Sequence, residues 1–261
     1  MEQINNAARF NELLKPHLKR GVRTNNFMLP QAYFELIADN RLFLLPTDAG
    51  LFLLVRMDGY YRLFYHFFEG ALPLKIAADL PVVVELPYND RTDTVAEQLE
   101  FLQKCGLQRQ VSRIRLSAER ESLSLRATAP VSIALPEQAN DISALLRTNF
   151  DRLYGFLPTQ DELRRAIAEG QILITSDGGN IAGILHFAPE GRNSVLLHLA
   201  VEESSRGQGF AQSLLAAWQN ATDAQRLLIW LNADNTPALR LYERCGFAPD
   251  GFRAEVLTQP N

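Results

Sequence analysis

The sequence has few of the residues that mark a metalloprotein. Its 261 residues contain only two cysteines, Cys105 and Cys245, and four histidines that are scattered along the chain. Neither cysteine has a Cys or His partner at the spacing of a metal-binding motif. We therefore expect no structural zinc and no other bound metal.

The chain also has no excess of basic charge and no long apolar run. Lys and Arg number 26 against 30 Asp and Glu, a formal net charge of -4, so nothing recruits a phosphate backbone and we expect no nucleic-acid partner. The most apolar stretch, residues 41–55, is interrupted by Pro46 and Asp48, and no run reaches the ~20 apolar residues of a membrane helix. The first ten residues lack the pattern of a secretory signal, so we expect a cytoplasmic protein with no membrane partner.

Apolar periodicity in the second half predicts strands that alternate with helices. In chain order it predicts strands at 171–175, 181–187 and 194–201, a helix from near 207, a strand at 227–231, a helix at 236–245 and an extended segment at 252–257. Thr159 is the expected N-cap of an earlier helix that Gly170 ends. Gly178 and Gly179 mark a tight turn between the first two strands. This order predicts a mixed α/β sheet.

The first half follows a similar order, which suggests an internal duplication. The helix end Phe101–Leu107 aligns without gaps with Leu241–Phe247, and each contains Cys-Gly followed by an apolar residue. We place the boundary near Ala129, giving domains at 1–128 and 129–261. The expected fold class is α/β, with two domains that each hold a mixed, mostly antiparallel sheet flanked by helices.

One strand is missing from the second half. The first half has a hairpin partner at Leu123–Thr128, but the second half stops after its segment at 252–257. We therefore expect a strand from the first half, most simply Leu123–Thr128, to complete the sheet of the second half.

A glycine-rich turn follows the strand at 194–201. It reads Arg206-Gly207-Gln208-Gly209-Phe210-Ala211 and leads into an apolar helix pattern. Small residues let backbone amides at a helix N-terminus approach an anion closely, and the helix dipole favours negative charge there. A dinucleotide fingerprint would need glycine at Gln212, and the Gly-Lys-Ser/Thr of a P-loop is absent. The turn therefore predicts a pyrophosphate site of another kind, with a plain strand-to-helix connection as the alternative.

Two motifs together resemble the GNAT superfamily of N-acetyltransferases. The acyl-CoA motif of that family, Arg/Gln-x-x-Gly-x-Gly/Ala, is matched by Arg206, Gly209 and Ala211. After an intervening strand, the second motif, Asn-x-x-Ala-x-x-Leu-Tyr-x-x-x-Gly-Phe, is matched by Asn235, Ala238, Leu241, Tyr242, Gly246 and Phe247. The resemblance covers about residues 130–257. It implies a GNAT fold there and acetyl-CoA as the co-substrate, without a metal.

The resemblance also implies roles for the matched residues. Those expected to bind the cofactor are Leu199, Ala200 and Val201 on the strand, Arg206, Gly207, Gln208, Gly209, Phe210 and Ala211 in the turn, and Asn235, Ala238 and Tyr242 beyond it. Tyr242 is also the expected catalytic proton donor to the departing CoA thiolate.

The general base has no such match. An amine of lysine type has a pKa of ~10.4, so its proton must leave before or during attack. The two positions at which family members carry a Glu hold Val195 and Trp230. His198 is the candidate catalytic base, with His186 as a second candidate, because imidazole titrates near neutrality.

These expectations lead to one functional hypothesis and one alternative. The first is transfer of an acetyl group from acetyl-CoA to a primary amine of a small molecule or peptide, bound near Phe150–Leu157. The alternative is a GNAT-like module that binds acyl-CoA as a sensor or structural ligand without turnover. The first half lacks the CoA motif and carries Leu102 where the second half has Tyr242, so we expect it to be a degenerate GNAT-like domain.

Overall fold

The computed structural model describes residues 1–259, which divide into two compact units. Unit 1 comprises Met1–Ser112 and the segment from Arg253 onward, and unit 2 is Arg113–Phe252. Two long strands belong to both units: β7 (Gln108–Glu119) begins in unit 1 and ends in unit 2, and β13 (Ala248–Thr258) does the reverse. The units therefore divide before the boundary expected at residues 128 and 129, and β7 and β13 each contribute residues to both units.

Unit 1 is a sheet with helices on both faces. Its elements are β1 (Glu2–Gln3), α1 (Ala7–Leu14), the 3-10 helix η1 (Lys15–His17), β2 (Val22–Thr24), α2 (Pro30–Ala38), β3 (Leu42–Leu44), β4 (Gly50–Arg56), β5 (Tyr61–Phe68), β6 (Val82–Asn89) and α3 (Val95–Lys104). The strand order is β1-β3-β4-β5-β6-β13, and β2 pairs with β5. The β5–β6 pair is parallel, whereas β1–β3, β3–β4, β4–β5 and β2–β5 are antiparallel.

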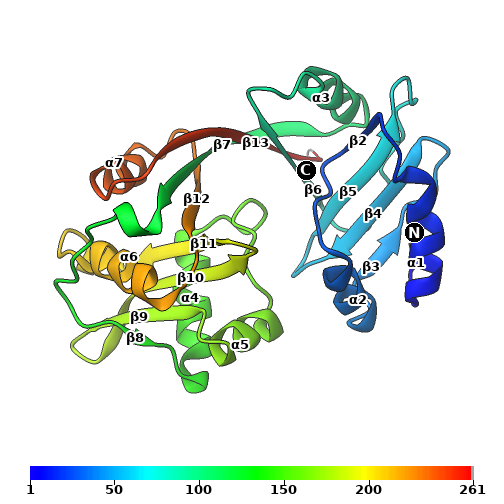
Figure 1. Cartoon of the computed structure of the whole chain (residues 1–261). Coiled ribbons are helices and arrows are strands. Elements are labelled where there is room, and N and C mark those ends of the chain that lie inside the picture. The colour runs from blue at the N-terminus through cyan, green and yellow to red at the C-terminus, as the bar shows by residue number, and fades with distance from the viewer. Residues whose placement is uncertain (260–261) are drawn as a thin grey trace. The chain divides into compact units, whose positions relative to one another are not determined.

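Strand β4 shows why both faces of this sheet are covered. Successive side chains of a strand point to opposite faces. Leu51 and Leu53 pack in the cluster that contains residues of α1 and α2, whereas Phe52 and Leu54 pack with residues of α3. Figure 1 shows these helices around β4 and β5. A nearly continuous apolar strand is therefore buried on both sides.

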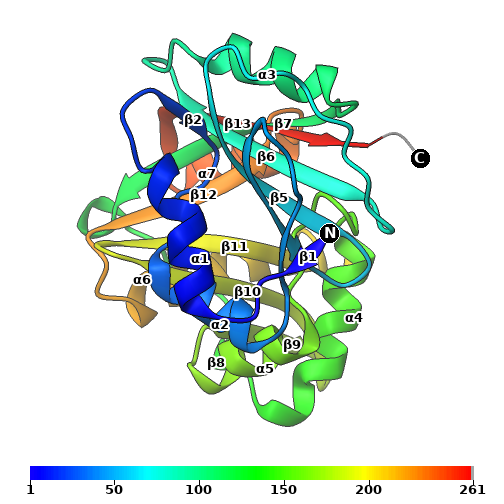
Figure 2. The same ribbon diagram turned by 90° about the vertical axis from the view of Figure 1, so that its right-hand side faces the viewer.

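Unit 2 repeats this arrangement. Its further elements are the 3-10 helix η2 (Arg120–Ser122), β8 (Ser132–Ile133), η3 (Pro136–Gln138), α4 (Ala139–Asn149), α5 (Gln160–Ala168), β9 (Ile172–Asp177), β10 (Asn180–Glu190), β11 (Asn193–Val201), η4 (Glu203–Ser205), α6 (Phe210–Ala221), β12 (Arg226–Asn232) and α7 (Thr236–Arg244). The order is β7-β12-β11-β10-β9-β8, and only the β11–β12 pair is parallel among these pairs. Figure 2 shows β10, β11 and β12 side by side.

Alternate residues of β9 and β10 separate the two faces of this sheet. Ile172, Ile174 and Ile184 pack with α4 and α5, while Leu173 and Leu185 pack under α6. Both units thus hold a mixed, mostly antiparallel sheet flanked by helices, and the predicted fold class is confirmed.

Local sequence signals act as expected in unit 2. The Thr159 hydroxyl accepts from the Glu162 amide at 3.3 Å, and the Glu162 carboxylate accepts from the Thr159 amide at 2.8 Å, which forms a capping box. Gly178 and Gly179 adopt positive φ values of 57° and 87° in the turn between β9 and β10. These positions favour glycine because a Cβ is strained there.

The helix ends that aligned in the sequence also have the same geometry. The Leu107 amide donates to the Leu102 carbonyl at 3.1 Å, and the Phe247 amide donates to the Tyr242 carbonyl at 3.0 Å. Between them, Gly106 and Gly246 have φ values of 89° and 95°. Each helix therefore ends in the same glycine-dependent C-cap, which supports the duplication.

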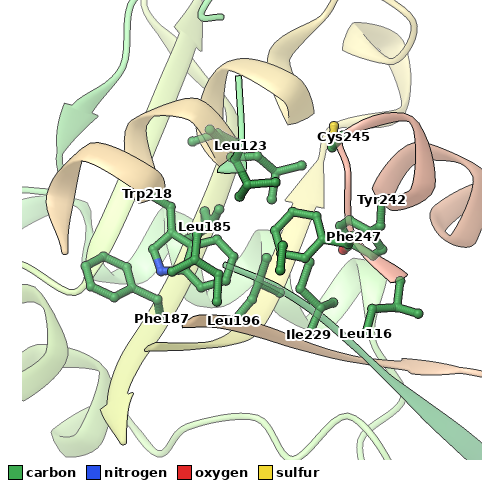
Figure 3. Close-up of a cluster of buried hydrophobic side chains, with 14 of the residues drawn as sticks. Leu116, Leu123, Leu185, Phe187, Leu196, Trp218, Ile229, Tyr242, Cys245 and Phe247 are labelled. Atoms are coloured by element: carbon green, nitrogen blue, oxygen red, sulfur yellow. The ribbon is translucent and has the colours of Figure 1, made fainter. Parts of the chain in front are cut away.

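The sheet of unit 2 is completed by β7, whose residues 113–119 pair with β12. A strand from before the expected boundary thus fills this position, but the specific prediction of Leu123–Thr128 is wrong. That segment forms no strand because side chains of α6 take its backbone hydrogen bonds. Gln219 Nε2 donates to the Leu123 carbonyl at 2.8 Å, and Ser213 Oγ accepts from the Thr128 amide at 2.9 Å. The Leu123 side chain is buried in the core of unit 2 (Figure 3).

Candidate functional site

The two parallel strands of unit 2 separate part of the way along. Their paired residues run from Asn193 with Arg226 to Leu196 with Ile229 and stop there, although β11 continues to Val201. A β-bulge lies at this point: His186 pairs with His198 and Phe187 with Leu196, which leaves Leu197 extra. Bulges often redirect a strand next to a functional site. Within the described chain, β11 beyond Leu196 thus pairs with β10 alone.

The free edge of β11 presents backbone polar groups to this gap. The Glu202 amide donates to the Ala182 carbonyl at 2.8 Å, and bonded pairs alternate along an antiparallel ladder. Ala200 is therefore bonded to β10, whereas the N–H and C=O groups of Leu199 and Val201 point into the gap. Of the three strand residues predicted to bind the cofactor, two present their backbone there and Ala200 does not.

A cluster of unbonded amides lies at the N-terminus of α6. Gly209 is the N-cap with a left-handed φ of 84°, and the Ser213 amide is the first to bond back, to the Gly209 carbonyl at 3.0 Å. None of the amides from Gly207 to Gln212 donates to a carbonyl within residues 1–259. The helix dipole adds partial positive charge at this end. The turn thus brings together the amides predicted to hold a diphosphate.

Arg206 departs from that prediction in one respect. Its amide donates to the Glu203 carbonyl at 3.3 Å, so it is not free for an anion. Its guanidinium instead donates to the Val201 carbonyl at 3.3 Å and to Asn149 Oδ1 at 3.0 Å. Arg206 therefore ties the turn to the end of β11 and to α4.

The matched residues at the start of α7 build the helix. Asn235 is the N-cap of α7, and its side-chain oxygen accepts from the Ala238 amide at 3.2 Å. Ala238 packs against the core of unit 2. Both residues thus position Tyr242, which lies two turns along the same helix.

Tyr242 is buried where α7 meets the core. Its ring lies edge-on to that of Phe247, with centroids 6.3 Å apart, in the cluster that also holds Trp218 (Figure 3). Its hydroxyl has no hydrogen-bond partner in the described part of the chain. Burial, and secondarily Cys245, raises the pKa of Tyr242. A phenol that keeps its proton at neutral pH is suited to donate one.

The two strand histidines form a buried pair. His186 Nδ1 and His198 Nδ1 lie 3.2 Å apart, and His198 Nε2 lies 2.9 Å from the Gly155 carbonyl. A carbonyl only accepts, so His198 carries its proton on Nε2 and accepts from His186 through Nδ1. Burial lowers the pKa of His186 to about 3, helped by His198, and burial lowers the pKa of His198 to about 4. Both rings are neutral at pH 7, and both nitrogens of His198 are engaged.

The segment expected to contact the acceptor is attached to the sheet. Besides the bond from His198 to the Gly155 carbonyl, Arg113 on β7 donates to the Tyr154 carbonyl, and its guanidinium lies 4.7 Å from the centre of the Phe156 ring. A Cβ at Gly155 would lie 2.4 Å from the Asp151 carbonyl oxygen, so only glycine fits. The loop between α4 and α5 therefore has a defined shape.

The usual acidic positions contain no free carboxylate. Val195 is buried, and Trp230 lies beside Arg115, whose guanidinium is 5.6 Å from its ring. Arg115 also pairs with Asp250 at 2.8 Å. The Asp250 carboxylate beside Trp230 and Arg115 is therefore paired with Arg115.

Comparison with known proteins assigns part of the second half to a domain family. Residues 168–249 match the family model of the acetyltransferase (GNAT) domain. The chain resembles a GCN5-related N-acetyltransferase from Sphaerobacter thermophilus (13% identity, 98% of this chain, 92% of that one, TM-score 0.58) and a Drosophila protein (13%, 97%, 96%, 0.59). It also resembles a tandem GNAT protein from the clavulanic acid biosynthesis pathway (12%, 97%, 94%, 0.56). No curated protein sequence matches it.

The fold is therefore that of the GNAT acetyltransferases over nearly the whole chain. Unit 2 carries a GNAT domain at residues 168–249, and the fold of the chain is similar to that of a tandem GNAT protein. The GNAT fold generally uses acetyl-CoA. Residues 1–259 contain no group of three His, Cys, Asp or Glu side chains that would hold a metal ion.

No helix in the described part of the chain has the length and hydrophobicity needed to cross a membrane.

Proposed function

We propose that unit 2 transfers an acyl group, most simply acetyl, from acyl-CoA to a primary amine of a small molecule or peptide. The observation that carries this proposal is the open edge of β11, which leads to the unbonded amides at the start of α6. The amide groups of a pantetheine arm complement the backbone N–H and C=O of Leu199 and the N–H of Val201, since the Val201 carbonyl accepts from Arg206. The diphosphate complements the amides from Gly207 to Ala211 and the helix dipole.

The chemistry requires three contributions from unit 2. The amine attacks the thioester carbonyl, a C–N bond forms, and the negative charge on the carbonyl oxygen is stabilised by a backbone N–H on the edge of β11. The C–S bond then breaks, and Tyr242 donates its proton to the CoA thiolate and takes up a proton from solvent afterwards. The third contribution is to hold the acceptor loop in place.

His198 has this third role in our proposal. Its two ring nitrogens are engaged by His186 and by the Gly155 carbonyl, so it is placed to fix the loop at 150–157 rather than to take a proton directly. We assign it as a positioning residue, in place of the catalytic base that the sequence suggested. The amine then loses its proton to solvent before or during attack.

Acyl-CoA binding and thiol release measured together test the proposal. Acetyl-CoA is expected to raise the Tm of the full chain, and adding a suitable amine to release free CoA thiol. A panel of aliphatic diamines, amino sugars and peptides with free N-termini covers the acceptor classes. An absence of both effects would contradict the proposal.

The alternative function is an acyl-CoA-binding module without turnover. Val195 and Trp230, at positions where other family members carry an acid, favour this alternative. It predicts that acetyl-CoA raises the Tm but that no amine in the panel releases thiol. The same two measurements therefore separate the enzyme from the module.

A further inference from the structure

The parallel strands of unit 1 also separate, but their gap is filled. Strands β5 and β6 pair only at Tyr61 with Val82 and at Arg62 with Val83. Further along, β2 pairs antiparallel with β5, from Val22 opposite Phe68 to Thr24 opposite His66. Because β4 covers the other edge of β5, β2 lies on the edge that faces the gap. A segment of the chain itself therefore occupies this edge.

Asn25, the residue after β2, bridges the two separated strands. Its Nδ2 donates to the Leu63 carbonyl on β5 and to the Glu85 carbonyl on β6, both at 3.0 Å. Its Oδ1 accepts from the Tyr65 amide at 2.9 Å. The side chain is 5% exposed. One carboxamide thus satisfies three backbone groups, with both of its N–H donors and with its oxygen.

We propose that unit 1 contains a carboxamide-binding site, made by the Leu63 carbonyl, the Tyr65 amide and the Glu85 carbonyl, which the chain occupies with its own Asn25. The ligand class of the site is a small primary amide. Two acceptors on different strands and one donor between them match both hydrogens and the oxygen of such an amide. This assignment stands on unit 1 alone and does not rest on the function proposed for unit 2.

The site is defined by strand divergence. Buried backbone groups need partners, and three groups on the two diverging strands are paired with one side chain. Filling the gap internally keeps β5 and β6 apart at a fixed spacing without any outside molecule. It also closes unit 1 to a pantetheine arm at the place that corresponds to the open edge of β11.

Removing the carboxamide and restoring it from solution tests the site. In Asn25→Ala the missing group is equivalent to formamide. We expect the variant to have a lower Tm than the wild type, and the difference to narrow as formamide is added. Asn26→Ala is the matched control, because Asn26 is the adjacent asparagine and its side chain contacts His66 Nε2 at 2.9 Å instead. Its Tm difference from the wild type is expected to stay constant in formamide.

One further variant and one further measurement keep the test decisive. Asn25→Leu fills the space without hydrogen bonds, so formamide is expected to give no recovery. Amide hydrogen exchange at Tyr65 is expected to be slow in the wild type, fast in Asn25→Ala and slow again with formamide. Equal recovery of Asn25→Leu and Asn25→Ala, or no recovery of either, would overturn the proposal.

Asn25→Asp covers the case in which Asn25→Ala does not fold. A carboxylate would face two carbonyl oxygens, so the folded protein holds the acid in its protonated form with a pKa above the ~3.9 of a free Asp. The protonated carboxyl of the Asn25→Asp variant stabilises the folded state at low pH, and this stabilisation is lost as pH rises through the pKa of the carboxyl in the folded protein. The Tm deficit against the wild type is therefore expected to grow from pH 4 to pH 7. A deficit independent of pH would refute the site.

Discussion

In unit 1 the gap between β5 and β6 holds β2 and the Asn25 side chain, whereas β11 of unit 2 keeps a free edge beyond Leu196 in the described chain. Both gaps arise where a parallel pair diverges in a duplicated sheet. Backbone groups left by such divergence need partners. Unit 1 obtains them from its own sequence, and in unit 2 we propose that a ligand supplies them.

The largest expected effect concerns Tyr242 of unit 2, whose aligned position in unit 1 is Leu102. Tyr242→Phe removes the proton donor and keeps the ring in its packed position, so kcat is expected to fall by about 10²- to 10⁴-fold. The KM for acetyl-CoA should change little, because the hydroxyl acts on the leaving thiolate. Steady-state thiol release measures both constants, and Tyr88→Phe in unit 1 serves as the control. An unchanged kcat would show that another group supplies the proton.

The next effect concerns the turn that unit 1 lacks. Gly209→Ala places a Cβ 2.6 Å from Thr128 Oγ1 at a φ of 84°. The left-handed conformation costs about 1–2 kcal/mol for a residue with a side chain. A turn that relaxes to avoid this cost must recover its shape to bind the diphosphate, so we expect acetyl-CoA to bind about 5- to 30-fold more weakly. Titration calorimetry measures the change.

Gly179→Ala is the matched control for Gly209→Ala. Gly179 has nearly the same φ, 87°, but a Cβ there meets open space in the turn between β9 and β10. The two variants share the backbone cost and differ in their position. Equal acetyl-CoA affinities in the two variants would argue against the turn as the diphosphate site.

The next effect concerns the stability of unit 2 at acidic pH. The pKa values of His186 and His198 lie at about 3 and about 4, below the ~6.5 of an unfolded histidine. The unfolded chain therefore binds more protons between these values, and stability falls as pH decreases from 6.5. We expect roughly 2 kcal/mol to be lost by pH 5 for each histidine, and so about 4 kcal/mol for the pair. Thermal unfolding at several pH values measures this loss, and His186→Asn should show a shallower pH dependence; an equally steep one would exclude the pair as the cause.

The last prediction is that unit 1 does not bind acetyl-CoA. Because the gap of unit 1 is filled, calorimetry is expected to find one acetyl-CoA bound per chain. Two sites of comparable affinity would contradict the division of roles between the units.

Local features of this fold were predictable because neighbouring residues determine them. Thr159 with Glu162 starts α5, Gly178 and Gly179 turn β9 into β10, and Cys245-Gly246 ends α7. The turn before α6, with its unbonded amides, belongs to the same class, since Gly209 and the following helix lie together in the sequence; its binding of a diphosphate stays a prediction. Tyr242 followed from a motif on one helix.

Features that depend on distant segments were not predictable in this way. The partner of β12 is set by which strand reaches it, and Leu123–Thr128 is apolar enough for a strand yet is held by Gln219 and Ser213. The engagement of His198 by Gly155 required the folded loop. Asn25 carries no motif, and only its contacts with two strands reveal its role.

The shared strands also constrain the order in which the protein can be completed during synthesis. The strand next to β6 in unit 1 comes from residues beyond Arg253, which the ribosome makes only after all of unit 2. While the later part of the chain emerges, β13 is not yet available to pair with β6. The sheet of unit 1 closes only when the far end of β13 arrives, so maturation of the first half follows translation of the second.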